Sequence, residues 1–455
     1  MPLTATRWLA EYAWLPAHAE PTPDVLIEVE DGRISAVTPL TPGSRPSSGV
    51  DVYADAVPLP GLTLPGLANA HSHAFHRALR GRTHDGRGDF FSWRDRMYAV
   101  ADRLDPDTYL ALARAVYAEM ALAGITCVGE FHYLHHRPDG GAYDDPNAMG
   151  AALVEAAAHA GVRLTLLDTC YLTSTVDGQP LAGPQRRFGD GDADGWARRA
   201  AAFQPTDSHV RVGAAVHSVR AVPADQLRTV ADWARDRRAP LHVHLSEQPA
   251  ENDECRAVHG RTPTALLADH GVLGPDTTAV HATHPTSADL TLLADSRTGV
   301  CLCPTTERDL ADGIGPARRM ADAGIRLSLG SDSHAVVDLF EEARAVELDE
   351  RLRTRRRGHF TPVELFTTAT AAGHAALGWT DAGRIAAGAR ADLVTVRLDS
   401  ARTAGVPPVG AFFAAVAADV DQVVVDGRVV VAEGRHLSVD VPAELSASIE
   451  AVTPS

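Results

Sequence analysis

The chain of 455 residues contains no lysine. A Schiff base, a pyridoxal-phosphate anchor and the lysine of a phosphate-binding loop are therefore excluded. A pair of metal ions bridged by a carboxylated lysine is excluded for the same reason. We therefore expect any hydrolytic chemistry here to use one metal ion or none.

Cysteine is scarce as well, with five residues scattered along the chain. Their odd number, and an N-terminal segment without an export pattern, lead us to expect reduced thiols in the cytoplasm. Cys301 and Cys303 are spaced like metal ligands, but we expect buried thiols on one face of a strand. No apolar run approaches the roughly 20 residues of a membrane span, so we expect no membrane association.

The chain is acidic, with a formal net charge of -17 at pH 7. This charge argues against binding to nucleic acid or to an anionic membrane surface. The basic cluster at residues 353–357 is expected to be a solvated helix end. An anionic substrate would need a locally basic pocket.

Both ends of the chain have the alternating pattern of β-strands. Residues 24–38 alternate around Asp31 and Gly32, which predicts a β-hairpin. Similar patterns return at residues 391–396 and 421–431. We expect both ends to build one small β-sandwich domain, because the chain exceeds the roughly 250 residues of a barrel.

The middle of the chain predicts a (β/α)₈ TIM barrel. Eight short apolar runs are separated by alanine-rich helical stretches such as residues 109–123, 146–160, 223–236 and 286–295, a pattern typical of parallel βαβ units. The eight runs are residues 62–70, 124–130, 162–168, 210–216, 240–245, 277–282, 298–303 and 325–330. The expected domains are 1–61 (sandwich, N-terminal part), 62–383 (catalytic barrel) and 384–455 (sandwich, C-terminal part).

Polar residues recur where the predicted barrel strands end, which is where barrels of this class place catalytic groups. Histidines, acidic residues and an arginine occupy these positions: His71, His73, Glu130, His217, Arg220, His244, Glu247, His281 and Asp332. We interpret this repeated placement as a single active site.

Three histidines and one aspartate among them form a candidate zinc site. His71 and His73 share a strand face, and His244 and Asp332 complete a set of four. His242 lies on the same face as His244, but farther from the strand end, and is the alternative ligand. Zinc is the expected metal, and iron is also feasible.

The remaining acid and base groups suggest hydrolysis. A metal lowers the pKa of bound water to about 7 and makes hydroxide available. Asp332 can accept the proton of that water, and Glu247 can pass a proton to a leaving nitrogen. His281 can hold the hydroxide or stabilise a tetrahedral intermediate.

These segments resemble the amidohydrolase superfamily, specifically its mononuclear deaminase branch. The motifs are PGLANAHSH at 65–73, HVHLSE at 242–247, VHATH at 280–284, GSDSH at 330–334 and GRIAAGARADLV at 383–394. The resemblance covers nearly the whole chain and implies a metal-dependent barrel with a split β domain.

Within that branch, further segments are similar to the formimidoylglutamate deiminase group. They are residues 73–75, 91–98, 129–136, 185–188 and 217–222. The implied reaction, a step of histidine degradation, converts N-formimino-L-glutamate and water to N-formyl-L-glutamate and ammonia. In this implied reaction, metal-bound hydroxide attacks the formimino carbon.

The implied substrate carries two carboxylates and a cationic formimino group. Arg94 and Arg220 can pair with carboxylates, whereas Glu247 can pair with the cationic nitrogen. His217 and Tyr133 can add hydrogen bonds. The resemblance also implies a homodimer in which Arg94 reaches the neighbouring subunit.

One position departs from the group's pattern, because His76 stands where glutamine is usual, near the substrate. Two other readings stay open. One is a deaminase of a nucleobase or nucleoside, which the 5% aromatic content and the two arginines disfavour. The other is a barrel without catalysis that serves as a binding subunit.

Overall fold

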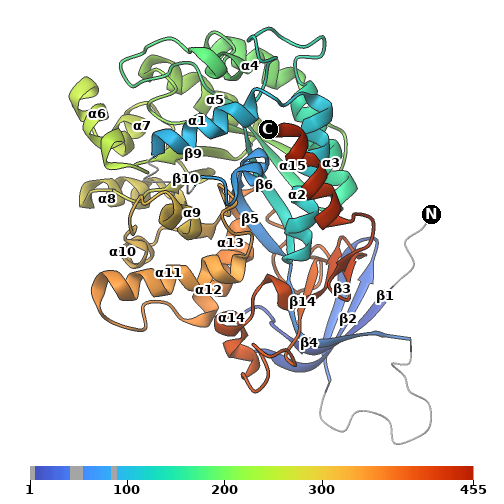
Figure 1. Ribbon diagram of the computed structural model, residues 1–455. Coiled ribbons are helices and arrows are strands. Elements are labelled where there is room, and N and C mark those ends of the chain that lie inside the picture. Colours follow the sequence, from blue (N-terminus) through green and yellow to red (C-terminus); the bar gives the residue numbers. More distant parts are fainter. Residues whose placement is uncertain (1–5, 41–54, 84–89, 454–455) are drawn as a thin grey trace, which may run out of the picture.

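The computed structural model describes residues 6–40, 55–83 and 90–453, which form a barrel beside a separate sheet (Figure 1). The side chains of residues 90–92 are not described. The loop expected at residues 41–49 lies outside the described residues. The predicted combination of a barrel with a β domain from both ends of the chain is confirmed.

Eight parallel strands form the barrel, and they follow one another around it in chain order. They are β5 (Leu67–Ser72), β6 (Ile125–His132), β7 (Arg163–Cys170), β8 (Val210–Val216), β9 (Leu241–Leu245), β10 (Thr277–His281), β11 (Gly299–Leu302) and β12 (Leu327–Leu329). The first strand meets the segment after the last one, where Ser72 and Asp332 form a parallel bridge. The N–H of Asp332 donates to the carbonyl oxygen of His71 at 3.0 Å, which closes the ring.

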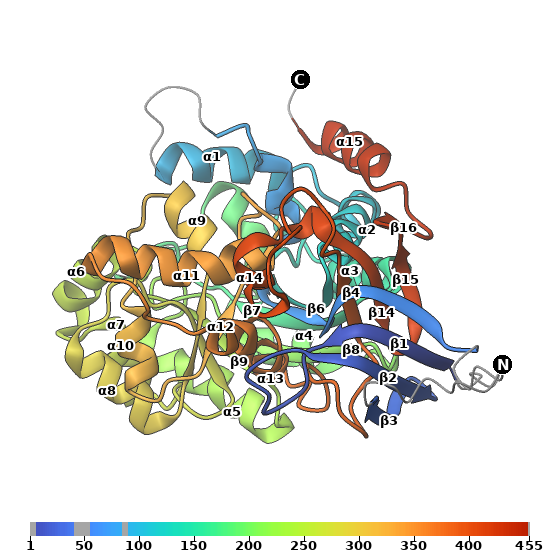
Figure 2. The same cartoon turned by 90° about the horizontal axis from the view of Figure 1, so that it is seen from below.

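Helices connect successive strands and surround the barrel (Figure 2). They are α1 (Phe90–Ala101), α2 (Pro106–Leu122), α3 (Ala148–Ala160), α4 (Ala193–Ala202), α5 (Leu227–Arg237), α6 (Pro249–His259), α7 (Pro263–Asp269), α8 (Ser287–Ser296), α9 (Pro304–Asp309), α10 (Ala317–Asp322), α11 (Leu339–Thr354), α12 (Pro362–Ala369) and α13 (Ala371–Ala376). The helical stretches predicted from alanine-rich sequence correspond to α2, α3, α5 and α8. Helix α2 starts at Pro106 because the Asp105 carboxylate accepts the N–H of Thr108, a capping box.

A second sheet joins both ends of the chain, in the order β16-β15-β14-β13-β4-β1-β2-β3. Its strands are β1 (Thr6–Ala13), β2 (Thr22–Glu30), β3 (Arg33–Pro39), β4 (Val57–Pro65), β13 (Leu393–Val396), β14 (Val420–Val425), β15 (Arg428–Ala432) and β16 (Arg435–His436). The predicted hairpin is β2 and β3, and its turn residues Asp31 and Gly32 have φ of 50° and 77°. Positive φ at both positions fits the tight turns that join antiparallel strands. The expected sandwich is thus one continuous sheet.

The apolar run predicted as one strand at 62–70 is divided between the two sheets. Strand β4 ends at Pro65 and pairs with β13, whereas β5 begins at Leu67 in the barrel. Gly66 makes the transition, because a Cβ there would lie 2.1 Å from Oγ1 of Thr126. The domain boundary expected between residues 61 and 62 therefore falls inside strand β4.

The last helix, α15 (Val441–Val452), lies against the barrel helix α2 (Figure 1). Arg114 of α2 and Glu444 of α15 form an ion pair at 2.7 Å. The C-terminal residues expected in the β domain thus end on the barrel.

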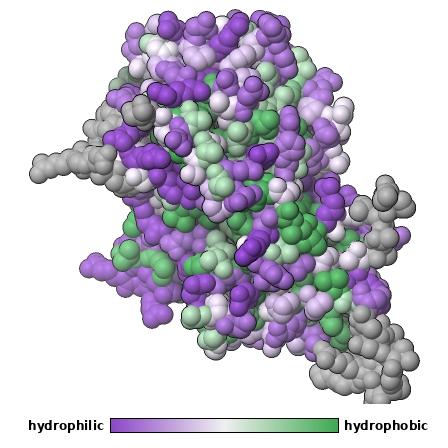
Figure 3. Space-filling view, turned by 45° about the vertical axis from the view of Figure 1, so that its right-hand side comes forward, coloured by the Kyte–Doolittle hydropathy of each residue, from purple (hydrophilic) through white to green (hydrophobic). Residues whose placement is uncertain are grey.

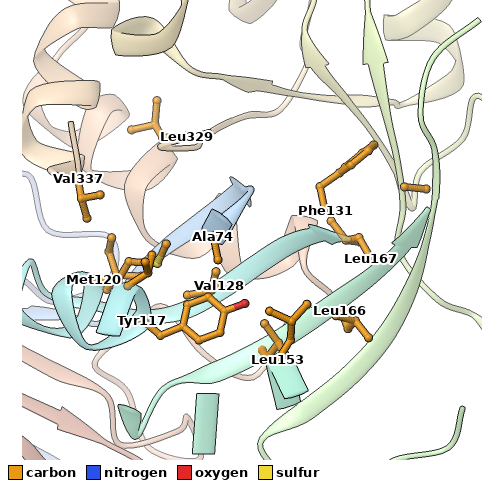
Figure 4. Packing of buried hydrophobic residues seen from close by; sticks show 14 of the residues in the cluster. Ala74, Tyr117, Met120, Val128, Phe131, Leu153, Leu166, Leu167, Leu329 and Val337 are labelled. Carbon is orange, nitrogen blue, oxygen red and sulfur yellow. The ribbon is translucent and has the colours of Figure 1, made fainter. Parts of the chain in front are cut away.

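Apolar residues fill the space between the barrel wall and its helices (Figure 4). Val128, Leu153 and Leu166 are fully buried there, on β6, α3 and β7. Phe131 points toward the barrel interior instead, with its ring centroid 4.3 Å from that of His244. One side of β6 therefore packs the core, and its end reaches the candidate site.

The face of the molecule in Figure 3 is mainly hydrophilic, with small separate apolar areas. No helix among the described residues is both long and apolar enough to cross a membrane. The five cysteines are free and buried.

Candidate metal centre and active site

Four buried side chains converge at the carboxyl ends of the barrel strands. His71 and His73 come from β5, His244 from β9, and Asp332 from the segment after β12. Their candidate ligand atoms all lie within 4.8 Å of one another. His71 Nε2 lies 3.1 Å from His244 Nε2 and 3.3 Å from Asp332 Oδ1. His73 Nε2 lies 3.4 Å from the same carboxylate oxygen.

The orientation of the rings fits a metal ion. His73 Nδ1 lies 3.0 Å from the carbonyl oxygen of Phe131, and His244 Nδ1 lies 2.9 Å from that of His217. A carbonyl accepts only, so each Nδ1 carries the proton and each Nε2 presents a lone pair to the centre. Ligands about 2.1 Å from one zinc ion stand roughly 3.0–3.5 Å apart, which matches these separations.

The charge states also suit a metal. Burial lowers the pKa of His71, and it lowers the pKa of His73 and of His244 well below the ordinary value. Burial alone would raise the pKa of Asp332. The hydrogen bond and charge of His71 hold that pKa well below its usual range. These directions favour unprotonated rings at His73 and His244 and an ionised Asp332, the protonation states that metal binding requires.

His281 lies beside this centre, among carboxylates. Its Nε2 is 3.8 Å from both Glu247 Oε1 and Asp332 Oδ2, and its Nδ1 is 3.5 Å from Glu307 Oε1. Burial lowers the pKa of His281, but these carboxylates raise it well above the ordinary value. Burial raises the pKa of Glu247. These directions favour a protonated His281 and a Glu247 that holds a proton more readily than an exposed carboxyl group does.

The backbone at these strand ends adopts conformations that side chains rarely favour. Ser246, His281, Asp332 and His334 all have positive φ, of 49°, 68°, 39° and 58°. Such residues persist where the surrounding structure holds them, often at functional sites. Three strand ends, those of β9, β10 and β12, carry this strain.

One cavity brings the predicted side chains together. His73, His76, Arg94, Tyr133, His217, Arg220, His244, Glu247, His281 and Asp332 all line it. His71 is fully buried and is not among the lining residues. His242 donates its Nε2–H to the carbonyl oxygen of Ala376 at 3.0 Å and is not one of the four clustered ligand candidates.

Aromatic residues form much of the cavity wall. Trp93 and Tyr98 come from α1, Tyr171 follows β7, and Phe188 belongs to the short helix η2 (Gly183–Phe188). The side-chain amide of Gln185 donates to the Tyr171 hydroxyl at 3.2 Å. Residues 91–98 and 185–188 carry the resemblance, but the sequence does not show which aromatic rings there line a cavity, and Tyr171 lies in no such segment.

Arg94 and Arg220 line this cavity together and also line an adjoining one. Burial lowers the pKa of Arg220, but Tyr171 and nearby glutamates raise it overall. The Arg94 guanidinium lies 5.8 Å from the ring centre of Tyr98, on the same helix. Arg94 thus lines a cavity of its own chain, and its contribution to a neighbouring subunit stays a prediction.

His76 lies between the metal cluster and the aromatic wall. Its Nε2 is 3.0 Å from the Tyr133 hydroxyl, and its ring centroid is 4.5 Å from that of His73. Burial lowers the pKa of His76 to about 3, so the ring is neutral. A neutral imidazole at this position can donate or accept one hydrogen bond, as a glutamine amide can.

Cys303 lies next to the centre, as its ligand atom falls within 4.8 Å of those of His281 and Asp332. Burial raises the pKa of the Cys303 thiol well above its usual value. This buried thiol agrees with the expectation for Cys301 and Cys303.

Comparisons with known proteins agree with this geometry. Formimidoylglutamate deiminase of Pseudomonas aeruginosa is 37% identical over 408 residues, which cover 86% of this chain and 89% of that protein. A 5-methylthioadenosine/S-adenosylhomocysteine deaminase of Halobacterium salinarum is 31% identical, over 92% of this chain and 90% of the relative. An 8-oxoguanine deaminase of Pseudomonas aeruginosa is 30% identical, over 91% of each chain.

A crystal structure of an amidohydrolase from Brucella melitensis has a TM-score of 0.88 with this chain, at 32% identity. The match covers 98% of this chain and 99% of that one. A zinc-bound adenosine deaminase from Xanthomonas campestris shares the fold, with a TM-score of 0.82 at 23% identity, over 98% of this chain and 97% of that one. The amidohydrolase family model matches residues 62–430. The chain therefore belongs to the amidohydrolase family and is a hydrolase that acts on carbon–nitrogen bonds.

Proposed function

We propose that this protein deaminates N-formimino-L-glutamate, giving N-formyl-L-glutamate and ammonia. The observation that carries the proposal is the presence of both acidic groups and two arginines in one cavity. Glu247, Asp332 and His281 lie close together in it, and Arg94 and Arg220 also line it. The substrate carries the complementary groups, a cationic formimino group and two carboxylates.

A single divalent ion would be held by His71, His73, His244 and Asp332. This donor set is typical of zinc, and iron can also use it. When bound, such an ion lowers the pKa of a coordinated water to about 7 and so supplies a nucleophile at neutral pH.

The chain's own groups move the protons. Asp332 accepts one proton from the attacking water as its oxygen bonds to the formimino carbon, which leaves a hydroxyl and an amino group on that carbon. Protonated Glu247 donates its proton to the amino nitrogen, and the carbon–nitrogen bond breaks to release ammonia. The hydroxyl proton returns to Glu247 as the formyl C=O forms, and Asp332 gives up its proton to solvent. Protonated His281 donates to the oxygen on which negative charge develops.

Two arginines recognise the other end of the substrate. Arg94 and Arg220 form charge-assisted pairs with the carboxylates. Tyr133, His217 and His76 add hydrogen bonds along the glutamate part, and Tyr133 is already 3.0 Å from His76. Both arginines line the cavity of a single chain. Recognition of the carboxylates as proposed here therefore does not require the homodimer that the resemblance implied.

A second candidate is deamination of a nucleobase or nucleoside, as the names of two relatives describe. The aromatic wall of Trp93, Tyr98, Tyr171 and Phe188 favours it, because aromatic rings stack on bases. Against it, an uncharged purine offers no carboxylate to Arg94 and Arg220, which both line the cavity.

The deciding experiment measures ammonia release from zinc-loaded protein. N-formimino-L-glutamate is offered beside 8-oxoguanine, adenosine, guanine and cytosine. Release from formiminoglutamate alone, lost after chelation and restored by zinc, is the expected result. Release from a base alone would replace the proposed substrate, and a chain that binds no metal would be a binding subunit.

A further inference from the structure

Five buried side chains form a hydrogen-bonded chain across the seam where the barrel closes. We call Asn69, Ser72, Glu130, Ser331 and His334 the seam chain, and each is 0% exposed. Asn69 Nδ2 lies 2.7 Å from Ser331 Oγ, which lies 3.4 Å from His334 Nδ1. His334 Nε2 lies 3.1 Å from Ser72 Oγ, which lies 3.1 Å from Glu130 Oε2.

The protons of the seam chain run in one direction. The Glu130 carboxylate accepts from Ser72, so Ser72 Oγ accepts from the Nε2–H of His334. His334 Nδ1 then accepts from the hydroxyl of Ser331, whose oxygen accepts from the amide of Asn69. The N–H of Ser331 returns to Asn69 Oδ1 at 2.9 Å. Each hydroxyl both donates and accepts, and the order fixes the tautomer of His334.

The seam chain alternates with the metal ligands along the sequence. Ser72 separates His71 from His73, and Ser331 precedes Asp332. The main chain joins the same two segments, because the N–H of Asp332 donates to His71 at 3.0 Å. The N–H of His73 donates to the carbonyl oxygen of Asp332 at 3.3 Å. Three of the four ligands therefore depend on the register of one seam.

The segment after β12 needs such support. Asp332 and His334 have φ of 39° and 58°, a region that residues with side chains rarely adopt. Ser333 adds a contact, because its hydroxyl lies 3.0 Å from that of Thr306. A segment in this conformation keeps its shape only where its contacts fix it.

We propose that the seam chain is a positioning device. It holds His71 and His73 at a fixed separation from Asp332 and thereby sets the affinity and the coordination geometry of the metal site. The inference rests on the metal centre of the proposed function, and it does not depend on which substrate that centre serves.

The test removes one hydroxyl at a time, in Ser72→Ala and Ser331→Ala. Zinc affinity is measured by competition with a chromogenic chelator at pH 8, where Glu130 is ionised. The control is Ser328→Ala, because this buried hydroxyl lies on β12, three residues before Ser331, and donates to the carbonyl oxygen of Val300 outside the seam chain. We expect about 10–100-fold weaker zinc binding in both seam variants, and an unchanged affinity in the control.

A double variant tests whether the two hydroxyls act together. Groups in one hydrogen-bonded chain are coupled, so Ser72→Ala with Ser331→Ala should cost little more than either single change. Cobalt-loaded protein adds a second readout, since its visible absorption reports ligand geometry. We expect a changed spectrum in both seam variants and an unchanged one in Ser328→Ala.

Zinc affinity and cobalt spectra equal to those of the unsubstituted chain, in folded seam variants, would overturn the positioning role. Additive losses in the double variant would also overturn it, because the two serines would then act separately. Absence of zinc binding by the unsubstituted chain is a different outcome, since it would remove the metal centre and the proposed function with it.

Discussion

The guanidinium of Arg187 donates to the carbonyl oxygen of Leu104 at 2.9 Å. It also donates to the carbonyl oxygens of Ala101 and His136, the latter at 3.2 Å. Arg187 is 0% exposed, and these three partners are main-chain groups. It therefore ties the end of α1 to the segment after β6, and α1 carries the cavity residues Arg94 and Tyr98.

Replacing this arginine should disturb substrate binding more than chemistry. In Arg187→Met three buried carbonyls lose a charged donor, so α1 is held less firmly. We expect KM to rise about 10–100-fold with a smaller change in kcat, together with a lower Tm. Arg186→Met, at the exposed neighbouring position, is the control. A lower Tm with an unchanged KM would mean that other contacts position α1.

Arg220→Met tests recognition of the carboxylates. A buried charge-assisted hydrogen bond contributes about 1.5–3 kcal/mol, so KM for N-formimino-L-glutamate should rise about 10–150-fold. Steady-state kinetics of the variant and of Arg228→Met, an exposed control on α5, give the comparison. An unchanged KM would place the carboxylates elsewhere in the cavity.

Asp332→Asn tests the proton acceptor. The amide keeps the size of the side chain but cannot accept the proton of the attacking water, so kcat should fall at least about 1000-fold. Circular dichroism should show an intact fold, and metal analysis separates loss of the ion from loss of the base. Turnover near that of the unsubstituted chain would remove Asp332 from the mechanism.

Glu130 gives a prediction about pH. Burial raises its pKa to about 7 from an ordinary value of 4.5, despite hydrogen bonds from Ala74 and Ser72. Between these pH values the folded chain keeps a proton that the unfolded chain has lost. Its free energy of unfolding therefore falls as pH rises from 4.5 through 7, by about 3 kcal/mol at most.

Glu130→Gln removes this titration. Urea unfolding with chelator present, at pH 5, 6, 7 and 8, should show the variant gaining stability relative to the unsubstituted chain as pH rises. Glu450→Gln, on the exposed face of α15, should show a difference that does not change with pH. A flat difference for Glu130→Gln as well would mean that Glu130 does not titrate in this range.

Much of the barrel could be predicted from sequence because its strands are short apolar runs with helices between them. The location of the site could also be predicted, since catalytic groups of such barrels lie at the carboxyl ends of the strands. His71, His244 and Asp332 do come together there. The division of 62–70 into β4 and β5 could not be predicted. Both halves are apolar, and the close packing of Thr126 and Asp392 around Gly66, where the chain passes from one sheet to the other, exists only in the folded chain.

Other features depend on contacts between distant segments. The sequence did not identify Tyr98 and Tyr171 as wall residues, because an aromatic ring that lines a cavity has the same local pattern as one in the core. The seam chain joins Asn69 to Ser331, 262 positions apart. No local pattern predicts such a pair until the first and last barrel strands are known to meet.

Strand β4 lies between β1 and β13, and this placement has a consequence during synthesis. One edge of β4 pairs with β1, which is made first, and the other edge pairs with β13. When β4 leaves the ribosome, β13 is still about 330 residues away, since β4 ends at Pro65 and β13 starts at Leu393. At roughly 5–20 residues per second, that edge stays open for tens of seconds. An open strand edge invites pairing with other chains, so a nascent or C-terminally truncated chain should depend on chaperones far more than the finished molecule.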